Sequence, residues 1–252
     1  MAKKSDYIAV FDSGVGGISV LKELLAQMPG ENYLYFGDSA NAPYGEKSTE
    51  QVRNLTLFAA EKLIARGIKA LVVACNTATA AAIIPLREAY PDTIIVGIEP
   101  ALKVAADQFP GKRIGVMATP VTLREEKFAQ QLHRFPNVQV TPIPVTGLVE
   151  QIEAGADKTQ ISRVLHACLD PYAGKLDAVV LGCTHYPFAA KEIRSVLGEG
   201  TVLLDGSTGT AAHTRRLLEA QGLLLGGTGS ITIENSSSDN AIIDRCRKLL
   251  EQ

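Results

Sequence analysis

Ala70-Leu-Val-Val-Ala-Cys75 is an apolar run of the kind that forms a strand buried on both faces of a parallel sheet. It has a counterpart in Ala178-Val-Val-Leu-Gly-Cys183, at an offset of 183 − 75 = 108 residues. A second pair, Ile8-Ala-Val-Phe-Asp-Ser-Gly14 and Ile114-Gly-Val-Met-Ala-Thr-Pro120, has nearly the same offset of 114 − 8 = 106 residues. Two similarities at nearly one offset predict that the chain consists of two related halves.

Strand-like runs alternate with helical patterns along the chain. In the first half the strand runs lie at 7–11, 33–36, 69–74 and 94–98, and the helical patterns at 18–28, 48–65 and 78–89, with Ser48 as an N-cap. This alternation predicts an α/β fold of two pseudo-symmetric domains. We expect each domain to be a mostly parallel sheet flanked by helices, with the active site in the cleft between them.

The expected domain boundaries follow from the repeat. The first domain is predicted to comprise residues 1–98 and 208–252, and the second residues 99–207, so that the chain crosses between them near Glu99-Pro100 and near Asp205–Ser207. Residues 230–252 are expected to add a short strand and a last helix to the first domain. Within them, Ser236-Ser-Ser238-Asp239 is predicted to be the capping loop of that helix.

Composition excludes several classes of protein. Apolar residues make up 46% of the 252 residues, which is typical of a globular chain, and the net charge of −2 is dispersed without a basic stripe for nucleic acid. No apolar stretch reaches the length of a membrane span, and the apolar run near the N-terminus is too short for a signal peptide. We therefore expect a cytoplasmic protein whose four cysteines are reduced, without a metal site.

The two repeat-matched cysteines are candidates for catalysis. Small polar residues follow each of them: Asn76-Thr77 after Cys75 and Thr184-His185 after Cys183. Cys75 also precedes a helical pattern, and a helix N-terminus stabilises both a thiolate and a bound carboxylate. A cysteine after an apolar strand is more often a small buried hydrophobe, but the matched position favours function. Cys168 and Cys246 lie on helical patterns and are predicted to be packing residues.

Asp12-Ser13-Gly14-Val15-Gly16-Gly17 forms a turn after the first strand run. A dinucleotide-binding loop is one alternative, with Asp38 near the ribose, but the third glycine of that motif would fall on Ser19. A carboxylate at Asp12 would also repel a pyrophosphate. It suits a substrate ammonium group or a basic partner for a nearby thiol. The other alternative is that Asp12 is a helix N-cap.

Two further groups are candidates for substrate contacts. Asn41-Ala-Pro43-Tyr44-Gly45 is a turn by composition, and its N–H groups with the Tyr44 hydroxyl are able to hold a second carboxylate. His185 lies two residues from Cys183, so its imidazole is placed to accept or return a thiol proton, although a solvated loop histidine is the alternative.

At these motifs the chain resembles the aspartate/glutamate racemase superfamily, and glutamate racemase within it. The matching stretches are Phe11-Asp-Ser-Gly-Val-Gly-Gly17, Gly37-Asp-Ser-Ala-Asn-Ala-Pro-Tyr-Gly45, Val73-Ala-Cys-Asn-Thr-Ala78 and Leu181-Gly-Cys-Thr-His-Tyr-Pro187. The resemblance implies that L- and D-glutamate are interconverted without pyridoxal phosphate, metal or other cofactor, supplying D-glutamate for peptidoglycan synthesis. Glutamate is then the expected partner, with neither nucleic acid nor membrane involved, and a homodimer is compatible with this interpretation.

The resemblance also implies roles for individual residues. Cys75 and Cys183 would be the two bases, with Asp12 assisting the first, His185 the second, and Glu150 supporting the side of the second. The substrate would be bound by Asp12, Ser13, Pro43, Tyr44, Gly45, Asn76, Thr77, Thr184 and His185. The sequence departs from the family pattern at Asn41, where arginine is common, and at Thr79, where serine is common.

Other functions are open from the residues alone. Racemisation of aspartate or isomerisation of another small diacid would use the same thiols, and the pocket for the side-chain carboxylate decides between them. A non-catalytic amino-acid-binding module would not need paired thiols at matched strand ends. A nucleotide-dependent dehydrogenase is disfavoured by the glycine turn.

Overall fold

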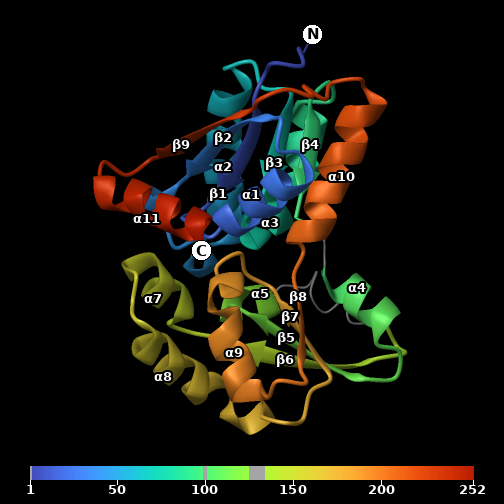
Figure 1. The fold of residues 1–252 in the computed structure, drawn as a ribbon, viewed down its shortest axis with the longest axis vertical. Coiled ribbons are helices and arrows are strands. Elements are labelled where there is room, and N and C mark those ends of the chain that lie inside the picture. The colour runs from blue at the N-terminus through green and yellow to red at the C-terminus, as the bar shows by residue number, and fades with distance from the viewer. Residues whose placement is uncertain (1, 99–100, 125–133) are drawn as a thin grey trace. The chain divides into compact units, whose positions relative to one another are not determined.

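The computed structural model describes residues 2–98, 101–124 and 134–252, drawn as a ribbon in Figure 1. The chain divides into two compact units: unit 1 comprises Met1–Glu99 and Ser207–Gln252, and unit 2 comprises Pro100–Gly206. Each has its own sheet. Among the described residues no helix combines the length and the apolar character that a membrane span requires.

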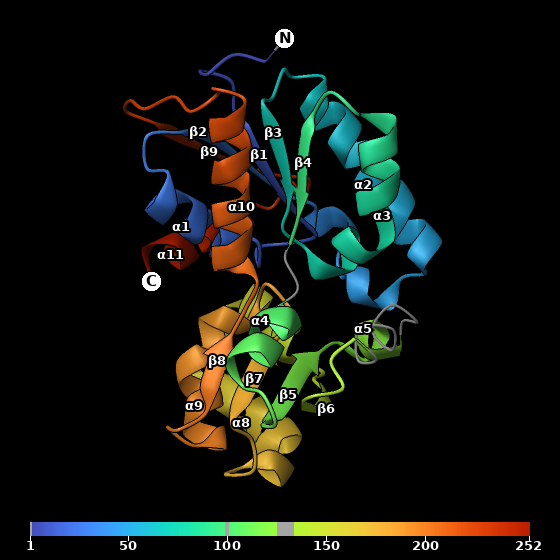
Figure 2. The ribbon, with the colours of Figure 1, turned by 90° about the vertical axis from the view of Figure 1, so that its right-hand side faces the viewer.

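Unit 1 is built on a five-stranded parallel sheet of order β4-β3-β1-β2-β9. Its strands are β1 (Ile8–Asp12), β2 (Asn32–Gly37), β3 (Ala70–Val73), β4 (Ile94–Gly97) and β9 (Ser230–Asn235). Its helices are α1 (Ile18–Gln27), α2 (Thr49–Ile64), α3 (Asn76–Ala89), α10 (Ser207–Ala220) and α11 (Asn240–Glu251), with 3₁₀ turns η1 (Ser39–Asn41) and η2 (Tyr44–Glu46). Figure 2 shows α2 and α3 on one face of this sheet, and α1, α10 and α11 on the other.

The sheet of unit 1 is buried on both faces because successive side chains of each strand point to opposite sides. Ala9 and Phe11 of β1 belong to the core that α2 and α3 cover, together with Leu71 and Val73 of β3. All residues of β1 and β3 are fully buried, which explains why β3 and the first four residues of β1 are apolar instead of alternating.

Unit 2 has a four-stranded parallel sheet of order β6-β5-β7-β8. Its strands are β5 (Arg113–Ala118), β6 (Gln139–Pro144), β7 (Ala178–Leu181) and β8 (Val202–Leu204). Its helices are α4 (Ala101–Gln108), α5 (Pro120–Arg124), α7 (Leu148–Ala154), α8 (Lys158–Leu169) and α9 (Ala190–Leu197), with 3₁₀ turns η3 (Asp170–Tyr172) and η4 (Tyr186–Ala189). Ile114, Val116 and Val180 form a core with α4, whereas Met117 and Leu181 join the core beneath α7, α8 and α9.

The strand orders of the two sheets confirm the internal repeat. In unit 1 the first four strands are ordered β4-β3-β1-β2, and in unit 2 the next four are ordered β8-β7-β5-β6. Numbered from the start of each unit, both orders read 4-3-1-2. The two cysteine-terminated runs are β3 and β7, so they occupy the same place in the two sheets. Strand β9 is an addition to unit 1 and pairs with β2.

Helix starts follow the expected capping chemistry, with one difference. Ser48 caps α2 through a capping box with Gln51, as the sequence predicts. The third helix begins at Asn76, two residues earlier than the predicted range 78–89, because Cys75 itself is its N-cap. Asp239 caps α11 by accepting a hydrogen bond from the Ala241 N–H group at 2.9 Å.

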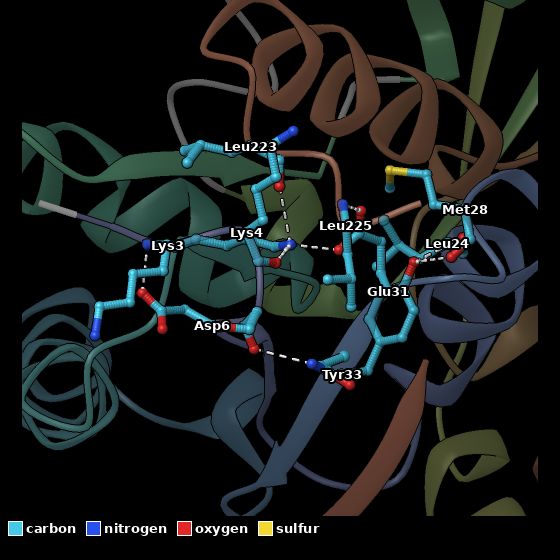
Figure 3. Close-up of polar contacts among 12 residues, drawn as sticks. Lys3, Lys4, Asp6, Leu24, Met28, Glu31, Tyr33, Leu223 and Leu225 are labelled. Atoms are coloured by element: carbon cyan, nitrogen blue, oxygen red, sulfur yellow. Dashed lines mark hydrogen bonds and ion pairs between the residues drawn. The ribbon is translucent and has the colours of Figure 1, made fainter. Parts of the chain in front are cut away.

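A buried ion pair joins distant segments at the amino ends of the strands of unit 1. The Lys69 ammonium group binds the Glu31 carboxylate, the carbonyl of Lys4 at 2.5 Å and the carbonyl of Leu223 at 3.1 Å. The second carboxylate oxygen of Glu31 accepts the N–H group of Leu225 at 2.7 Å. Figure 3 shows the segments that meet here. Neither charged side chain is exposed, so the pair ties the start of the chain and the loop after α10 to the sheet.

Candidate active site

The candidate residues of unit 1 collect at the carboxyl ends of adjacent parallel strands, where α/β sheets carry their binding sites. Asp12 ends β1, Asp38 follows β2, and Cys75 lies two residues after β3. Strands β2 and β3 both pair with β1, so these three loops are neighbours. A hydrogen bond from the Asp38 N–H group to the Asp12 carbonyl, at 2.9 Å, joins two of them.

Cys75 has the surroundings of a stabilised thiolate. Its Sγ atom accepts the N–H group of Ala78 at 3.4 Å, the N-cap interaction at the start of α3. Sγ also lies 3.4 Å from the Ser13 hydroxyl, to which the thiol donates. With the proton gone, the same hydroxyl is able to donate to sulfur. Free N–H groups and a helix dipole at an N-terminus favour an anion there, so the geometry favours a nucleophilic or basic thiol.

Asp12 is fully buried beside this thiol loop and does not cap the following helix. The N-cap of α1 is Gly17, so the helix-cap interpretation of Asp12 is wrong. One carboxylate oxygen accepts the Gly14 N–H group at 3.0 Å, which closes the turn. A Cβ atom at Gly17 would lie 2.6 Å from the Cβ atom of Asp12, so glycine is required there. Gly17 therefore makes room for the Asp12 side chain.

Asp38 organises the loop that carries the predicted carboxylate-binding turn. Its Oδ2 atom accepts the Tyr44 hydroxyl at 2.7 Å, and both of its oxygens accept the Asn41 amide, at 3.0 and 3.1 Å. Burial raises the pKa of Tyr44 far above its usual range, and the hydrogen bond to Asp38 and the negative charges of Asp38, Cys75 and Asp12 raise it further. Tyr44 therefore stays protonated and holds the loop through Asp38, a use of its hydroxyl that the sequence does not predict.

The other substrate-binding candidates of unit 1 are partly exposed around this edge. Pro43 and Gly45 flank the buried Tyr44, while Asn76 and Thr77 open α3 directly after Cys75. Thr79, one of the two departures from the family pattern, donates to the Val73 carbonyl at 3.0 Å. That bond places its hydroxyl on the backbone of β3.

In unit 2, Cys183 has a different set of partners. Its Sγ atom lies 3.6 Å from Nδ1 of His185, and Nε2 of the same imidazole lies 2.6 Å from Oε1 of Glu153. Whereas Cys75 caps an α-helix, Cys183 is followed by the 3₁₀ turn η4, and α9 begins only at Ala190. The second thiol therefore has a histidine and a carboxylate in place of a helix N-terminus.

The contacts of His185 favour its charged form. Burial alone would lower the pKa of this imidazole, but the hydrogen bonds to Cys183 and Glu153, with the attraction of their negative charges, raise it well above its usual value. An imidazolium between a carboxylate and a thiol stabilises the thiolate. The solvated-loop alternative for His185 is wrong, because the residue is only 3% exposed.

Glu150 and Thr184 are the other two candidate residues near this arrangement. Glu150 is exposed in the first turn of α7, and the carboxylate that contacts His185 comes from Glu153, one helical turn later. Thr184 is buried between the thiol and the imidazole residues along the chain. The signal for Glu153 was its i, i+3 spacing from Glu150, which places both on neighbouring positions of a helix.

Tyr186 and Cys168 complete the surroundings of the second thiol. Both pack in the core that also contacts Cys183. Burial raises the pKa of Tyr186 well above its usual value, with further contributions from the charges of Cys183, Cys168 and Glu150. Within the described ranges, histidine, cysteine and carboxylate side chains form no group of three arranged to hold a metal ion.

Known proteins similar to this chain in sequence and fold are racemases. The family described as Asp/Glu/Hydantoin racemase matches residues 12–217. A glutamate racemase of Clostridium perfringens is 45% identical over 253 residues, covering 98% of this chain and 97% of that protein. The crystal structure of glutamate racemase isoform RacE1 from Bacillus anthracis has a TM-score of 0.88 at 30% identity, covering 99% of this chain and 95% of that one. A Francisella tularensis glutamate racemase in complex with D-glutamate has a TM-score of 0.85 at 28% identity, covering 99% and 95%.

Two related parallel α/β units, each with a cysteine at the same strand end, define a class of enzyme that carries one thiol on each half of the chain. The chain belongs to the Asp/Glu/Hydantoin racemase family.

Proposed function

We propose that this chain interconverts L- and D-glutamate, with Cys75 and Cys183 as two opposed acid/base groups and without a cofactor. The observation that carries the proposal is the equivalence of the two thiols. Each follows the same strand of its sheet, and each has its own polar partners, Ser13 and the α3 N-terminus for one and His185 for the other. Simple amino-acid binding would give no reason for two such thiols.

The chemistry needs two such groups. Inversion at Cα requires that a proton leave one face and that another proton arrive on the opposite face. One thiolate takes the Cα proton and becomes a thiol, while the other thiol donates its proton and becomes a thiolate, so atoms and charge balance. The reverse reaction starts from the state that the forward reaction leaves. A single base would have to move from one face of the substrate to the other.

The carbanionic intermediate needs electrostatic stabilisation because the Cα–H group is a very weak acid. Donors held ready near the α-carboxylate, from Asn76 and Thr77 at the start of α3 and from Thr184, would supply part of it. Asp12 and His185 would assist Cys75 and Cys183 respectively. Among carboxylates near the second thiol, Glu153 contacts the histidine, so we assign it the support that the resemblance gives to Glu150.

The choice of glutamate as substrate rests on the relatives, several of which are named glutamate racemase at 44 to 49% identity over nearly the whole chain. The loop that carries Pro43, Tyr44 and Gly45 would hold the side-chain carboxylate. D-Glutamate would then serve peptidoglycan synthesis in the cytoplasm.

The test is to incubate the purified protein with L-glutamate in deuterated water without added cofactor. We expect D-glutamate to accumulate until the enantiomers are equal, with deuterium incorporated at Cα of the product. A parallel incubation with L-aspartate distinguishes the sister activity. Inversion of aspartate with glutamate left unchanged would contradict the proposal, as would a reaction that begins only when pyridoxal phosphate is added.

A further inference from the structure

We infer that Asn235 and Ser236, at the end of β9, are positioning residues for the substrate-binding loop 37–45. This inference rests on the proposed function, since it concerns how that loop holds glutamate. The sequence predicts that the serine-rich tract 236–239 caps the last helix. The structure gives its first residues hydrogen bonds to a loop 196 positions earlier.

Three hydrogen bonds join Asn235 and Ser236 to the loop. The Ser236 hydroxyl accepts the N–H group of Ala40 at 3.0 Å, and the Ser236 N–H group donates to the carbonyl of Gly37 at 2.9 Å. The Asn235 side-chain amide donates to the Ser39 hydroxyl at 2.9 Å. Asn235 and Ser236 therefore hold residues 37–40 through one backbone N–H group and two side chains.

Gly37 lies where the loop 37–45, the turn after Asp12 and the Asn235 side chain approach one another closely. A Cβ atom there would lie 2.4 Å from the Gly14 carbonyl and 2.7 Å from the Asn235 amide nitrogen. Asn235 thus confines Gly37 against the turn that follows Asp12. Glycine is required at this position because the backbone is packed between the two loops.

The contacts reach the substrate-binding residues through Asp38. Asp38 directly follows Gly37, and its carboxylate holds the Tyr44 hydroxyl and the Asn41 amide. A shift of residues 37–40 therefore moves the carboxylate to which Tyr44 is tied. Strand β9 is an edge strand that pairs with β2, whereas Cys75 follows β3 on the far side of β1, so Asn235 and Ser236 are placed to position this loop from the other side of the sheet.

We expect changes at Asn235 and Ser236 to weaken substrate binding and to leave kcat nearly unchanged. The loop would hold the side-chain carboxylate equally in the ground state and in the transition state, and loss of such uniform binding raises KM without changing kcat. The loss of one neutral hydrogen bond corresponds to about three- to tenfold in an equilibrium constant.

The experiment compares Ser236→Ala and Asn235→Ala with Ser236→Thr, which keeps the accepting hydroxyl, and with Ser238→Ala. Ser238 is exposed in the same tract, and the structure assigns its hydroxyl no hydrogen bond to a described residue. We expect KM for both enantiomers of glutamate to rise about three- to tenfold in the two alanine variants. We expect kcat to stay within about twofold, Ser236→Thr to restore KM, and Ser238→Ala to match the wild type.

Amide hydrogen exchange gives a second readout that does not depend on turnover. The Ala40 N–H group should exchange faster in Ser236→Ala and retain its protection in Ser238→Ala. An unchanged KM in both alanine variants, or an equal rise in Ser238→Ala, would overturn the inference. If the wild-type protein failed to racemise glutamate, the proposed function would be lost. Hydrogen exchange at the Ala40 N–H group would still decide whether Ser236 holds the loop.

Discussion

Nε2 of His185 lies 2.6 Å from Oε1 of Glu153, and Nδ1 of the same ring lies 3.6 Å from Sγ of Cys183. The three groups form a line of carboxylate, imidazole and thiol within unit 2. Cys75 instead lies at a helix N-terminus and contacts the Ser13 hydroxyl. The two thiols would therefore be activated by different physical means at equivalent places in the repeat.

Glu153→Gln is expected to lower kcat/KM by about ten- to hundredfold, the effect of losing one charge-assisted hydrogen bond. The raised pKa of His185 falls when the carboxylate is removed. A raised pKa means that the charged imidazole stabilises the fold fully below about pH 6.5 and that this contribution is lost as the pH rises through the folded value. In the variant this contribution is smaller, and it is fully lost at a lower pH because the folded pKa is lower. NMR titration of the imidazole measures the pKa of His185, and the pH profile of kcat/KM measures the effect on the reaction.

Glu150→Gln is the matched control for Glu153→Gln, since it removes an exposed carboxylate from the same helix. We expect less than about a threefold change in kcat/KM, because solvent screens an exposed charge. A larger effect for Glu150→Gln than for Glu153→Gln would return the supporting role to Glu150.

Cys75→Ala and Cys183→Ala should each leave a folded protein whose racemisation is reduced by more than about 10³-fold, because each removes one of two required bases. Cys168→Ala is the control: it removes a half-buried thiol on α8 from the core around Cys183 and should remain active. Circular dichroism checks the fold, and polarimetry follows the reaction. Substantial racemisation by either of the first two variants would refute the two-base assignment.

Isotope effects should separate the two faces of the substrate. The resemblance assigns Cys183 to the proton of L-glutamate and Cys75 to that of D-glutamate. His185→Asn should then raise the Cα-deuterium isotope effect on kcat/KM for L-glutamate, and Asp12→Asn that for D-glutamate. The ratio of the two kcat/KM values cannot change, because the equilibrium constant fixes it. Identical changes for both enantiomers in both variants would show that Asp12 and His185 act on binding instead.

Lys69→Met is expected to destabilise the protein by about 3 to 5 kcal/mol, because it leaves the Glu31 carboxylate buried without its partner. The double variant with Glu31→Gln should recover part of this loss, since no buried charge then remains. Arg66→Gln, which breaks the half-exposed ion pair with Glu234, should cost less than about 1 kcal/mol. Urea unfolding of the three variants measures these differences, and equal losses for Lys69→Met and Arg66→Gln would contradict the account.

The apolar runs and their spacing were enough to predict the parallel α/β architecture. Runs such as Ala70–Val73 and Ala178–Leu181 are apolar throughout, which only strands buried on both faces require. Capping is equally local, so Ser48 could be predicted from its neighbours alone. The start of the third helix was missed because a thiol is not a usual N-cap.

By itself, the sequence determined the two sheets, the equivalence of Cys75 and Cys183, and the polar residues that follow them, because strand pattern and motif spacing are local properties. Only the tertiary structure decided which carboxylate meets His185. Glu150 and Glu153 lie one turn apart, and the burial of Leu148 and Ile152 fixes the rotation of α7 that brings Glu153 to the imidazole. Packing likewise placed Asn235 against the loop of Asp38, because the pairing of β9 with β2 joins segments that no local pattern relates.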